Sequence, residues 1–360
     1  MNKYIFYLKQ FPFHKFLFLF LIIFSILSIL ISCQVPSIHN KVLVNIILFW
    51  IIIIIFSFII DYTLFLKFAD LFLIFSIALS LLSTFNGIQT NHYRWLSIPV
   101  LNLDISPIVF LKFSLIFYII KCTDKLKSEV ISFKQFYTTY GIPILISLMV
   151  GLIVDLSQTL IMFILLLGLL WIYKQKLKYI LSLLILPLIY IIVFILLNDH
   201  YLHRVVSLIF TSINSHIGDN YQINQAYETF KNIGFLGIGF ENKGLASSIP
   251  VYLSDFVFVY VAEDVGLLGI LFIILLYIIL IVKAIYLSCR IINFQAFLII
   301  IGLSYFQICQ LIVHLLVTTG LIPVFSTYMP YVSPTRSSFL LYDGIVSAIL
   351  INLSMKSNTL

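Results

Sequence analysis

The stretch PVYLSDFVFVYVAEDVG, Pro250 to Gly266, opens an apolar run that continues to Val282, yet it carries three carboxylates, Asp255, Glu263 and Asp264. An apolar run of this length is typical of a helix that spans a bilayer. A charged side chain is costly in that environment and usually faces the interior of a helix bundle. The three acids therefore need a structural or chemical reason to be there.

Composition places these acids in a membrane protein. Hydrophobic residues make up 62% of the 360 residues and charged residues only 10%, which excludes a water-soluble domain. Apolar runs of about 18 residues or more recur and predict an all-α polytopic membrane protein, a single domain over residues 1–360 with about ten transmembrane helices. The expected spans lie near residues 16–33, 43–60, 64–84, 105–120, 140–154, 158–173, 179–197, 256–282, 291–317 and 338–354.

The basic residues favour one orientation of these spans. If the N-terminus is cytoplasmic, fourteen of the 21 lysines and arginines fall inside, six fall outside, and Lys112 lies within a span. Because cytoplasmic loops are enriched in Lys and Arg, the bias predicts that both termini are cytoplasmic. Merging the two short spans around Asp155 would put Lys174 to Lys178 outside, so we expect a tight turn there. The net charge of +7 then reflects topology, and no nucleic-acid partner is expected.

A large extracytoplasmic loop is expected between helices 7 and 8, over residues 198–255, and it is too long to be a simple connector. Its glycine-rich part, GFLGIGFENKG (Gly234 to Gly244), lacks the strand and helix context of a nucleotide-binding fingerprint. The four cysteines fall on different sides of the membrane or within it, so no disulfide framework is expected, and no Cys or Cys/His spacing indicates zinc.

Short motifs follow one another along the chain from near residue 90 onward. They are Arg94-Trp95-Leu96, Pro107 with Lys112, Asp155-Leu156, Arg204, Tyr221-Gln222, Gln225-Ala226, Gly234 to Gly239, Pro250 with Ser254-Asp255-Phe256, Glu263-Asp264-Val265-Gly266, and Pro330 to Ser338. In their order, spacing and side of the membrane they resemble the motifs of the SEDS family of bacterial cell-wall polymerases, the FtsW and RodA proteins. The resemblance extends from near residue 90 to the end of the chain.

Two positions depart from the family pattern. Val109 stands where the family has a glutamate close to Lys112, and Pro334-Thr335-Arg336 stands where it has Tyr-Gly-Gly. The chain therefore resembles a divergent member of the family.

The resemblance implies a peptidoglycan glycosyltransferase that polymerises lipid II into glycan strands at the outer face of the bacterial cytoplasmic membrane. A sugar hydroxyl is a poor nucleophile, so a carboxylate placed against it accelerates attack as a general base. Asp255 lies at the outer end of a span, where water, sugar and lipid head group meet, and it is the expected catalytic residue. Ser254 is expected to cap the helix, whose dipole would favour the ionised carboxylate.

The other two acids are expected to hold the bundle together. Glu263 and Asp264 follow Asp255 by eight and nine residues, which places them about 12 Å deeper in the membrane. We expect a structural ion pair for Glu263, with Lys112 as a candidate cation, and a structural or supporting role for Asp155.

The expected substrate-binding residues are outer cations and the polar or aromatic residues of the motifs. Arg suits bidentate contact with a diphosphate and Lys supplies a point charge, although an interfacial cation or tryptophan also serves lipid contacts alone. The candidates are Arg94, Trp95, Lys112, Arg204, Gln222, Lys243, Ser333, Ser337 and Ser338, with Arg336 beside them. No cofactor is implied with certainty, and a divalent cation on the diphosphate is left open.

The partners implied by the resemblance are lipid II, the nascent glycan strand, the lipid bilayer, a class B penicillin-binding transpeptidase and other membrane proteins of the divisome or elongasome. The short chain and the loop IPVLNLDISP (Ile98 to Pro107) favour the division type, FtsW, over RodA. Two alternatives stay open. A flippase for lipid-linked precursors would use a polar cavity around Lys112, Glu263 and Asp70, and a scaffold that has lost its activity would tolerate the two departures.

Overall fold

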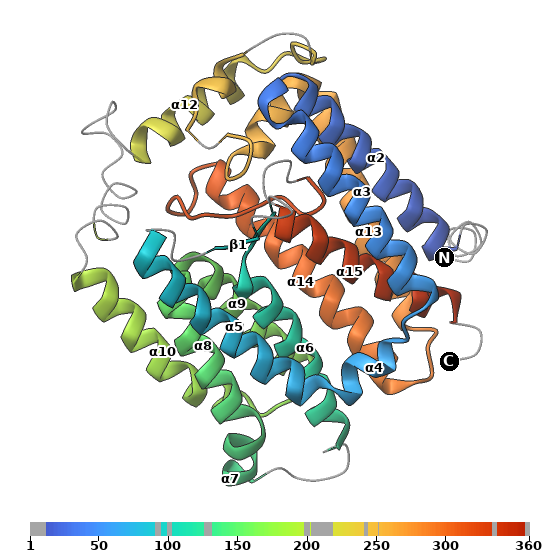
Figure 1. Cartoon of the computed structure of the whole chain (residues 1–360), viewed down its shortest axis with the longest axis vertical. Coiled ribbons are helices and arrows are strands. Elements are labelled where there is room, and N and C mark those ends of the chain that lie inside the picture. The colour runs from blue at the N-terminus through green and yellow to red at the C-terminus, as the bar shows by residue number, and fades with distance from the viewer. Residues whose placement is uncertain are drawn as a thin grey trace.

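The computed structural model describes residues 12–90, 95–98, 103–125, 132–197, 202, 219–240, 244–250, 252–332 and 337–356. Ten long helices dominate this part of the chain and form one bundle (Figure 1). They are α2 (Phe13–Cys33), α3 (Pro36–Phe58), α5 (Ala69–Thr90), α6 (Pro107–Lys125), α8 (Ile142–Val154), α9 (Leu156–Ile172), α10 (Leu177–Leu197), α13 (Val257–Ser288), α14 (Phe294–Thr318) and α15 (Ser337–Met355).

The other elements lie between these ten helices. They are α4 (Tyr62–Lys67), the strands β1 (Leu96–Ile98) and β2 (Leu103–Ile105), α7 (Phe133–Phe136), the π-helical turn η2 (Tyr137–Gly141), α12 (Asp219–Asn232) and the 3-10 turn η3 (Leu245–Ser248). The two strands form an antiparallel hairpin in which Leu96 pairs with Ile105. Both α12 and the hairpin lie at one end of the bundle, here called the loop face, whereas the start of α2 and the end of α15 lie at the other end (Figure 1).

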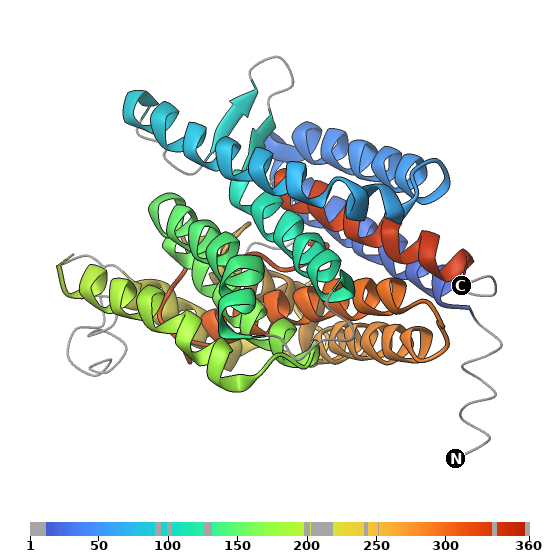
Figure 2. The same cartoon turned by 90° about the horizontal axis from the view of Figure 1, so that it is seen from below.

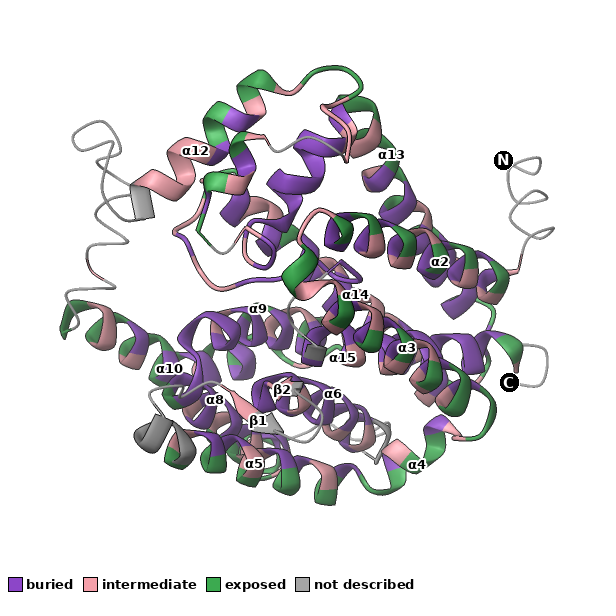
Figure 3. Cartoon of the chain, turned by 45° about the horizontal axis from the view of Figure 1, so that its top comes forward, coloured by how far each residue is buried: buried purple, intermediate pink, exposed green. Residues whose placement is uncertain are grey.

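The ten helices lie where the ten spans were expected, and the all-α fold is confirmed. Among the described residues, seven segments are long and apolar enough to cross a membrane: α2, α3, residues 133–154, α10, α13, α14 and residues 338–355. The apolar helices over residues 69–85 and 156–172 are shorter, and α6 is interrupted by Lys112 and Lys121. Exposed residues lie along α3, α5 and α10, as the green segments of Figure 3 show, and many of them are large and apolar. Most polar residues of α9 and α14, and Lys112 and Ser114 of α6, are buried. This arrangement suits a lipid environment.

Helix pairs from distant parts of the chain close the bundle. The first and last spans meet because α15 packs on α3 and α2, whereas α14 packs between α6, α9 and α13. Seen from below in Figure 2, α2, α3 and α15 lie close together in one half of the bundle. Asn352 of α15 donates to the Ser57 carbonyl of α3 at 2.9 Å, and Gly344 lies where a Cβ would contact Phe49. The chain therefore folds as one bundle in which α15 depends on α3.

The tight turn at Asp155 is confirmed. Its backbone is extended (φ −153°, ψ 103°), and its carboxylate accepts from the amides of Ser157 at 2.9 Å and Gln158 at 3.2 Å. This is the N-cap arrangement that satisfies amides without a partner in the helix, so Asp155 separates α8 from α9.

The expectation of one continuous helix after Asp255 is wrong. The helix breaks at Gly266 (φ 71°, ψ −174°), a left-handed conformation that favours glycine, and residues 257–265 form a half-helix. Nor does Ser254 cap this helix, because the N-cap position is Phe256 and no side chain caps it.

The glycine-rich segment Gly234–Gly239 fills the break. The amides of Ile238 and Gly239 donate to the carbonyls of Glu263 and Asp264, each at 3.0 Å. The amides of Leu267 and Leu268 donate to the carbonyls of Gly234 and Phe235, each at 3.2 Å. Backbone groups left unpaired in a membrane are costly, so these four bonds replace what the helix loses. A Cβ at Gly266 would lie 2.2 Å from the Gly237 nitrogen, which explains why two glycines meet here.

Candidate functional site

The site begins with a segment outside the helices, residues 326–331, that follows α14, ends in a turn and is held from four helices. We call it the anchored segment. Its backbone or side-chain contacts are Gln158 Nε2 to the Ser326 carbonyl at 2.8 Å, His314 Nδ1 with Thr327 Oγ1 at 3.1 Å, Gln310 Nε2 to the Tyr328 carbonyl at 3.3 Å, Tyr277 Oη to the Pro330 carbonyl, and the Tyr331 amide to Asp343 Oδ2 at 2.7 Å. A segment with this many buried contacts is fixed in place.

Asp255 lies in the turn before α13 and faces the anchored segment. Its Oδ1 accepts a hydrogen bond from Ser326 Oγ at 3.4 Å, and the residue is partly exposed at the loop face. The Ser326 carbonyl accepts from Gln158 Nε2, and Gln158 Oε1 accepts from Lys112 Nζ at 2.5 Å. A chain of polar contacts therefore joins Lys112 in α6 to Asp255 before α13.

Lys112 is almost completely buried, with 1% of its surface exposed. Besides Gln158, it meets the ring of Phe306 at 5.7 Å, and the Asp155 carboxylate interacts with it electrostatically. The expected contact of Lys112 with Glu263 or Asp264 is therefore wrong. The cation uses the acceptor and counter-charge at the start of α9, because α6 packs against α9.

Glu263 binds the loop and does not form the expected ion pair. Its two carboxylate oxygens accept from the amides of Leu245 at 2.7 Å and Ala246 at 3.0 Å, so it caps η3 from the half-helix. Within the described ranges it has no cationic partner. Asp264 accepts from Gln34 Nε2 at 3.0 Å, and Tyr260 Oη donates to Gln34 Oε1. Both acids therefore hold the half-helix by accepting hydrogen bonds from neutral donors.

The remaining predicted residues are only partly tested. Trp95 packs edge-on against Phe339 of α15, with ring centroids 5.7 Å apart, so its ring contacts protein. Gln222 lies half-buried on α12, and Ser338 is buried in the first turn of α15. Arg94, Arg204, Lys243, Ser333 and Arg336 lie outside the described residues, as does the side chain of Ser337. No group of three or more metal-binding side chains occurs among the residues that the structure places.

Three residues of this site were missed from the sequence. Gln158 follows Asp155 by three residues at the start of an expected span, where a polar side chain is a visible signal. Asp343 is an acid inside an expected span, which by itself marks a candidate for function. Ser326 carries no such signal, because only the fold brings it to Asp255.

The fold and the site together define a polytopic α-helical membrane protein with a partly exposed carboxylate at one face and a buried lysine beneath it. A model of the FtsW/RodA/SpoVE family, described as cell cycle protein, matches residues 9–359. The chain belongs to this family, which is the SEDS family whose motifs it resembles.

Individual relatives are similar over most of the chain. A probable peptidoglycan glycosyltransferase FtsW of Geobacter sulfurreducens is 26% identical over 271 residues, 73% of this chain and 70% of the relative. One of Coxiella burnetii is 26% identical over 265 residues, 71% of this chain and 70% of the relative.

Solved structures share the fold. A chain from a structure described as a peptidoglycan synthase complex matches with a TM-score of 0.76 at 17% identity, covering 95% of this chain and 97% of that one. The rod shape determining protein RodA of Thermus thermophilus matches with a TM-score of 0.67 at 15% identity, covering 94% and 96%. The bundle described above is therefore the fold of this family.

Glu263→Gln tests how the loop is held. The amide nitrogen of glutamine cannot accept from a backbone amide, so one of the two donors at η3 loses its acceptor, at a cost of about 1 to 3 kcal/mol. We expect a lower melting temperature of the purified protein in detergent. Glu228→Gln is the matched control, because Glu228 is half-exposed and pairs only with Lys231 on the surface of α12, and it should melt like the wild type. Equal melting temperatures of the two variants would contradict this account.

Proposed function

We propose that the chain polymerises lipid II and that Asp255 is the general base of this reaction. The chain is a peptidoglycan glycosyltransferase of the SEDS family, the activity for which its relatives are named. The observation that carries the proposal is the position of Asp255: a carboxylate partly exposed at the loop face, held by Ser326 and joined through Gln158 to a buried lysine.

The proposed step is a direct displacement at a sugar carbon. Asp255 takes the proton of the acceptor hydroxyl while the hydroxyl oxygen bonds to the anomeric carbon of the donor. The bond from that carbon to the diphosphate oxygen breaks, and the polyprenyl diphosphate leaves with the electron pair. Asp255 then releases its proton to water. Lys112, fixed beneath the site, supplies a positive charge that favours the ionised carboxylate and the charge growing on the diphosphate.

Cations at the loop face are proposed to hold the diphosphate, because Arg and Lys bind phosphate oxygens by charge-assisted hydrogen bonds. The candidates stay those of the sequence, Arg94, Arg204, Lys243 and Arg336. Trp95, Gln222, Ser333, Ser337 and Ser338 are proposed contacts for the sugars and the head group.

A penicillin-binding transpeptidase is the proposed partner. A chain that shares the fold comes from a structure described as the structural coordination of polymerization and crosslinking by a peptidoglycan synthase complex. A role in division, beside divisome proteins, is favoured over elongation by the FtsW names of relatives that are about one quarter identical.

The proposed location is the bacterial cytoplasmic membrane with both termini inside, which places the loop face outside. The lysine and arginine bias supports this orientation. Tags before Met1 and after Leu360 should be accessible only from the cytoplasm, and a tag near Ser215 only from outside. An external terminus would put Asp255 on the wrong side for lipid II polymerisation.

The contacts of three residues do not support the flippase alternative. Asp70 is half-exposed and pairs with Lys121 at 2.5 Å, whereas Glu263 binds loop amides and Lys112 binds Gln158. The three residues that a transport path would need each have different partners. A scaffold without activity remains distinguishable by reconstitution, because it would neither polymerise lipid II nor move it.

Asp255→Asn is the test of the proposed base. The amide keeps the size of the side chain but has no basic oxygen, so polymerisation of lipid II by the purified protein should fall about 10²- to 10⁴-fold. Asp104→Asn is the matched control, because Asp104 is a half-exposed acid of the hairpin that pairs with Lys41 at 3.2 Å. The control should polymerise at the wild-type rate, and both variants should insert and melt normally. Polymerisation by Asp255→Asn near the wild-type rate would show that Asp255 is not the base.

A further inference from the structure

Asp343 is a completely buried carboxylate in the span α15, and the proposed reaction gives it no role. Its oxygens accept from two neutral donors: Oδ2 from the Tyr331 amide at 2.7 Å, and Oδ1 from Gln307 Nε2 at 2.9 Å. No ion pair to Asp343 occurs among the described residues. A buried acid in a membrane span is costly without a cation, so the two hydrogen bonds to Asp343 indicate a function.

The donor at Tyr331 belongs to a strained turn. Tyr331 has φ 65°, a left-handed backbone conformation that residues other than glycine rarely adopt. In the described ranges, Lys174 is the one other non-glycine residue with a positive φ. Strain of this kind persists only where the surroundings impose it. The preceding carbonyl, that of Pro330, accepts from Tyr277 Oη, and the Tyr331 ring packs edge-on against Phe20 at 5.2 Å. Asp343 therefore holds the central amide of a turn that is fixed on every side.

The turn ends the anchored segment, whose first residue touches Asp255. Ser326 and Tyr331 are five residues apart, and the chain between them is held by α14. We propose that Asp343 is a positioning residue: it holds the strained turn at Tyr331 and thereby presents Ser326 to Asp255. This inference rests on the proposed function of Asp255. Asp343 acts in it as an acceptor of hydrogen bonds and neither carries a proton nor touches substrate.

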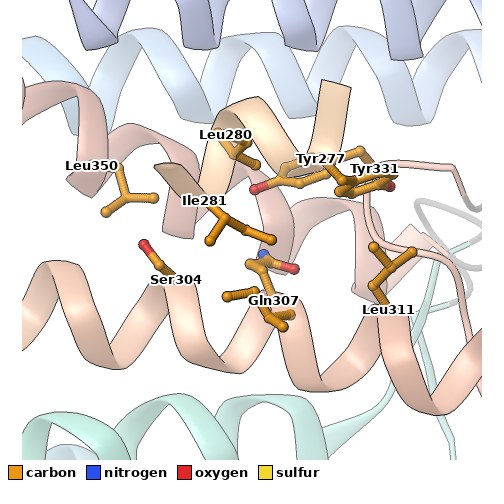
Figure 4. Close-up of a pocket in the computed structure, with 9 residues that line it drawn as sticks. Tyr277, Leu280, Ile281, Ser304, Gln307, Leu311, Tyr331 and Leu350 are labelled. Atoms are coloured by element: carbon orange, nitrogen blue, oxygen red, sulfur yellow. The ribbon is translucent and has the colours of Figure 1, made fainter. Parts of the chain in front are cut away.

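Gln307 allows a variant that removes the charge of Asp343 and keeps its hydrogen bonds. Gln307, Tyr277 and Tyr331 line one small cavity between α13 and α14, and Figure 4 shows the Gln307 amide below the two tyrosines. Gln307 Oε1 has no hydrogen-bond partner in the described part of the chain. With Asn at position 343, its Oδ1 still accepts from the Tyr331 amide. A half-turn of the Gln307 amide then lets Oε1 accept from the new Nδ2, so both bonds survive.

Asp343→Asn should therefore polymerise lipid II within about threefold of the wild type, whereas Asp343→Leu, which has no acceptor, should lose about tenfold or more in kcat with little change in KM. Asn352→Leu is the matched control on the same helix, because it removes a buried hydrogen bond to α3 far from the site. It should lower the melting temperature and leave the kcat of the folded protein unchanged. If Asp343→Leu does not fold, Gln307→Leu removes one of the two bonds with an apolar side chain, and its kcat should fall about fivefold.

A second readout separates this inference from the proposed function. The double variant Asp255→Cys/Ser326→Cys should form a disulfide on mild oxidation. The disulfide should form equally well with Asp343 retained or with Asp343→Asn added, and far less with Asp343→Leu. This geometry is measurable even if the wild type makes no polymer, a result that would overturn the proposed function alone. The positioning role is overturned if folded Asp343→Asn is as inactive as Asp343→Leu, or if Asp343→Leu keeps both the wild-type kcat and the disulfide.

Discussion

The buried ammonium group of Lys112 is the constraint on which the site depends. A lysine inside an apolar bundle needs an acceptor and a counter-charge, and the start of α9 provides both through Gln158 and Asp155. The Asp155 carboxylate also caps α9, so the same residue ends one helix, starts the next and faces the cation. Gln158 Nε2 then donates to the Ser326 carbonyl and holds Ser326 beside Asp255. One buried charge therefore orders elements that are far apart in the sequence.

The break in α13 explains how a long loop can carry part of a precise site. The half-helix ends at Gly266, and the segment Gly234–Gly239 supplies the backbone partners that the membrane cannot. Glu263 binds η3, and Asp264 reaches Gln34 in the turn between α2 and α3. The three carboxylates of the opening stretch thus have different roles. Asp255 lies partly exposed at the loop face, and Glu263 and Asp264 hold the half-helix that follows Asp255.

The sequence predicts the bundle well because its signals are local. Apolar runs mark the spans, and an acid between two short runs marks the turn at Asp155, since a cap acts within three residues. The partner of Lys112 could not be predicted, because its acceptor is a neutral side chain 46 residues away, whereas the acids at 263 and 264 carry the opposite charge. The break at Gly266 is hidden for a similar reason: a single glycine fits many helices, and only its contact with Gly237 requires a left-handed backbone. Asp343 is visible as an intramembrane acid, but its partner is a backbone amide, which no residue type reveals.

The central claim is that Gln158 acts on Asp255 through Ser326, so a double-mutant cycle on these two residues tests it most directly. The measurement is the rate of lipid II polymerisation by purified Gln158→Leu, Ser326→Ala and the double variant. If Gln158 matters by placing the Ser326 hydroxyl, the double variant should be no slower than the slower single variant. Losses that multiply independently would contradict the account, because they would mean that Gln158 and Ser326 affect the reaction by separate routes.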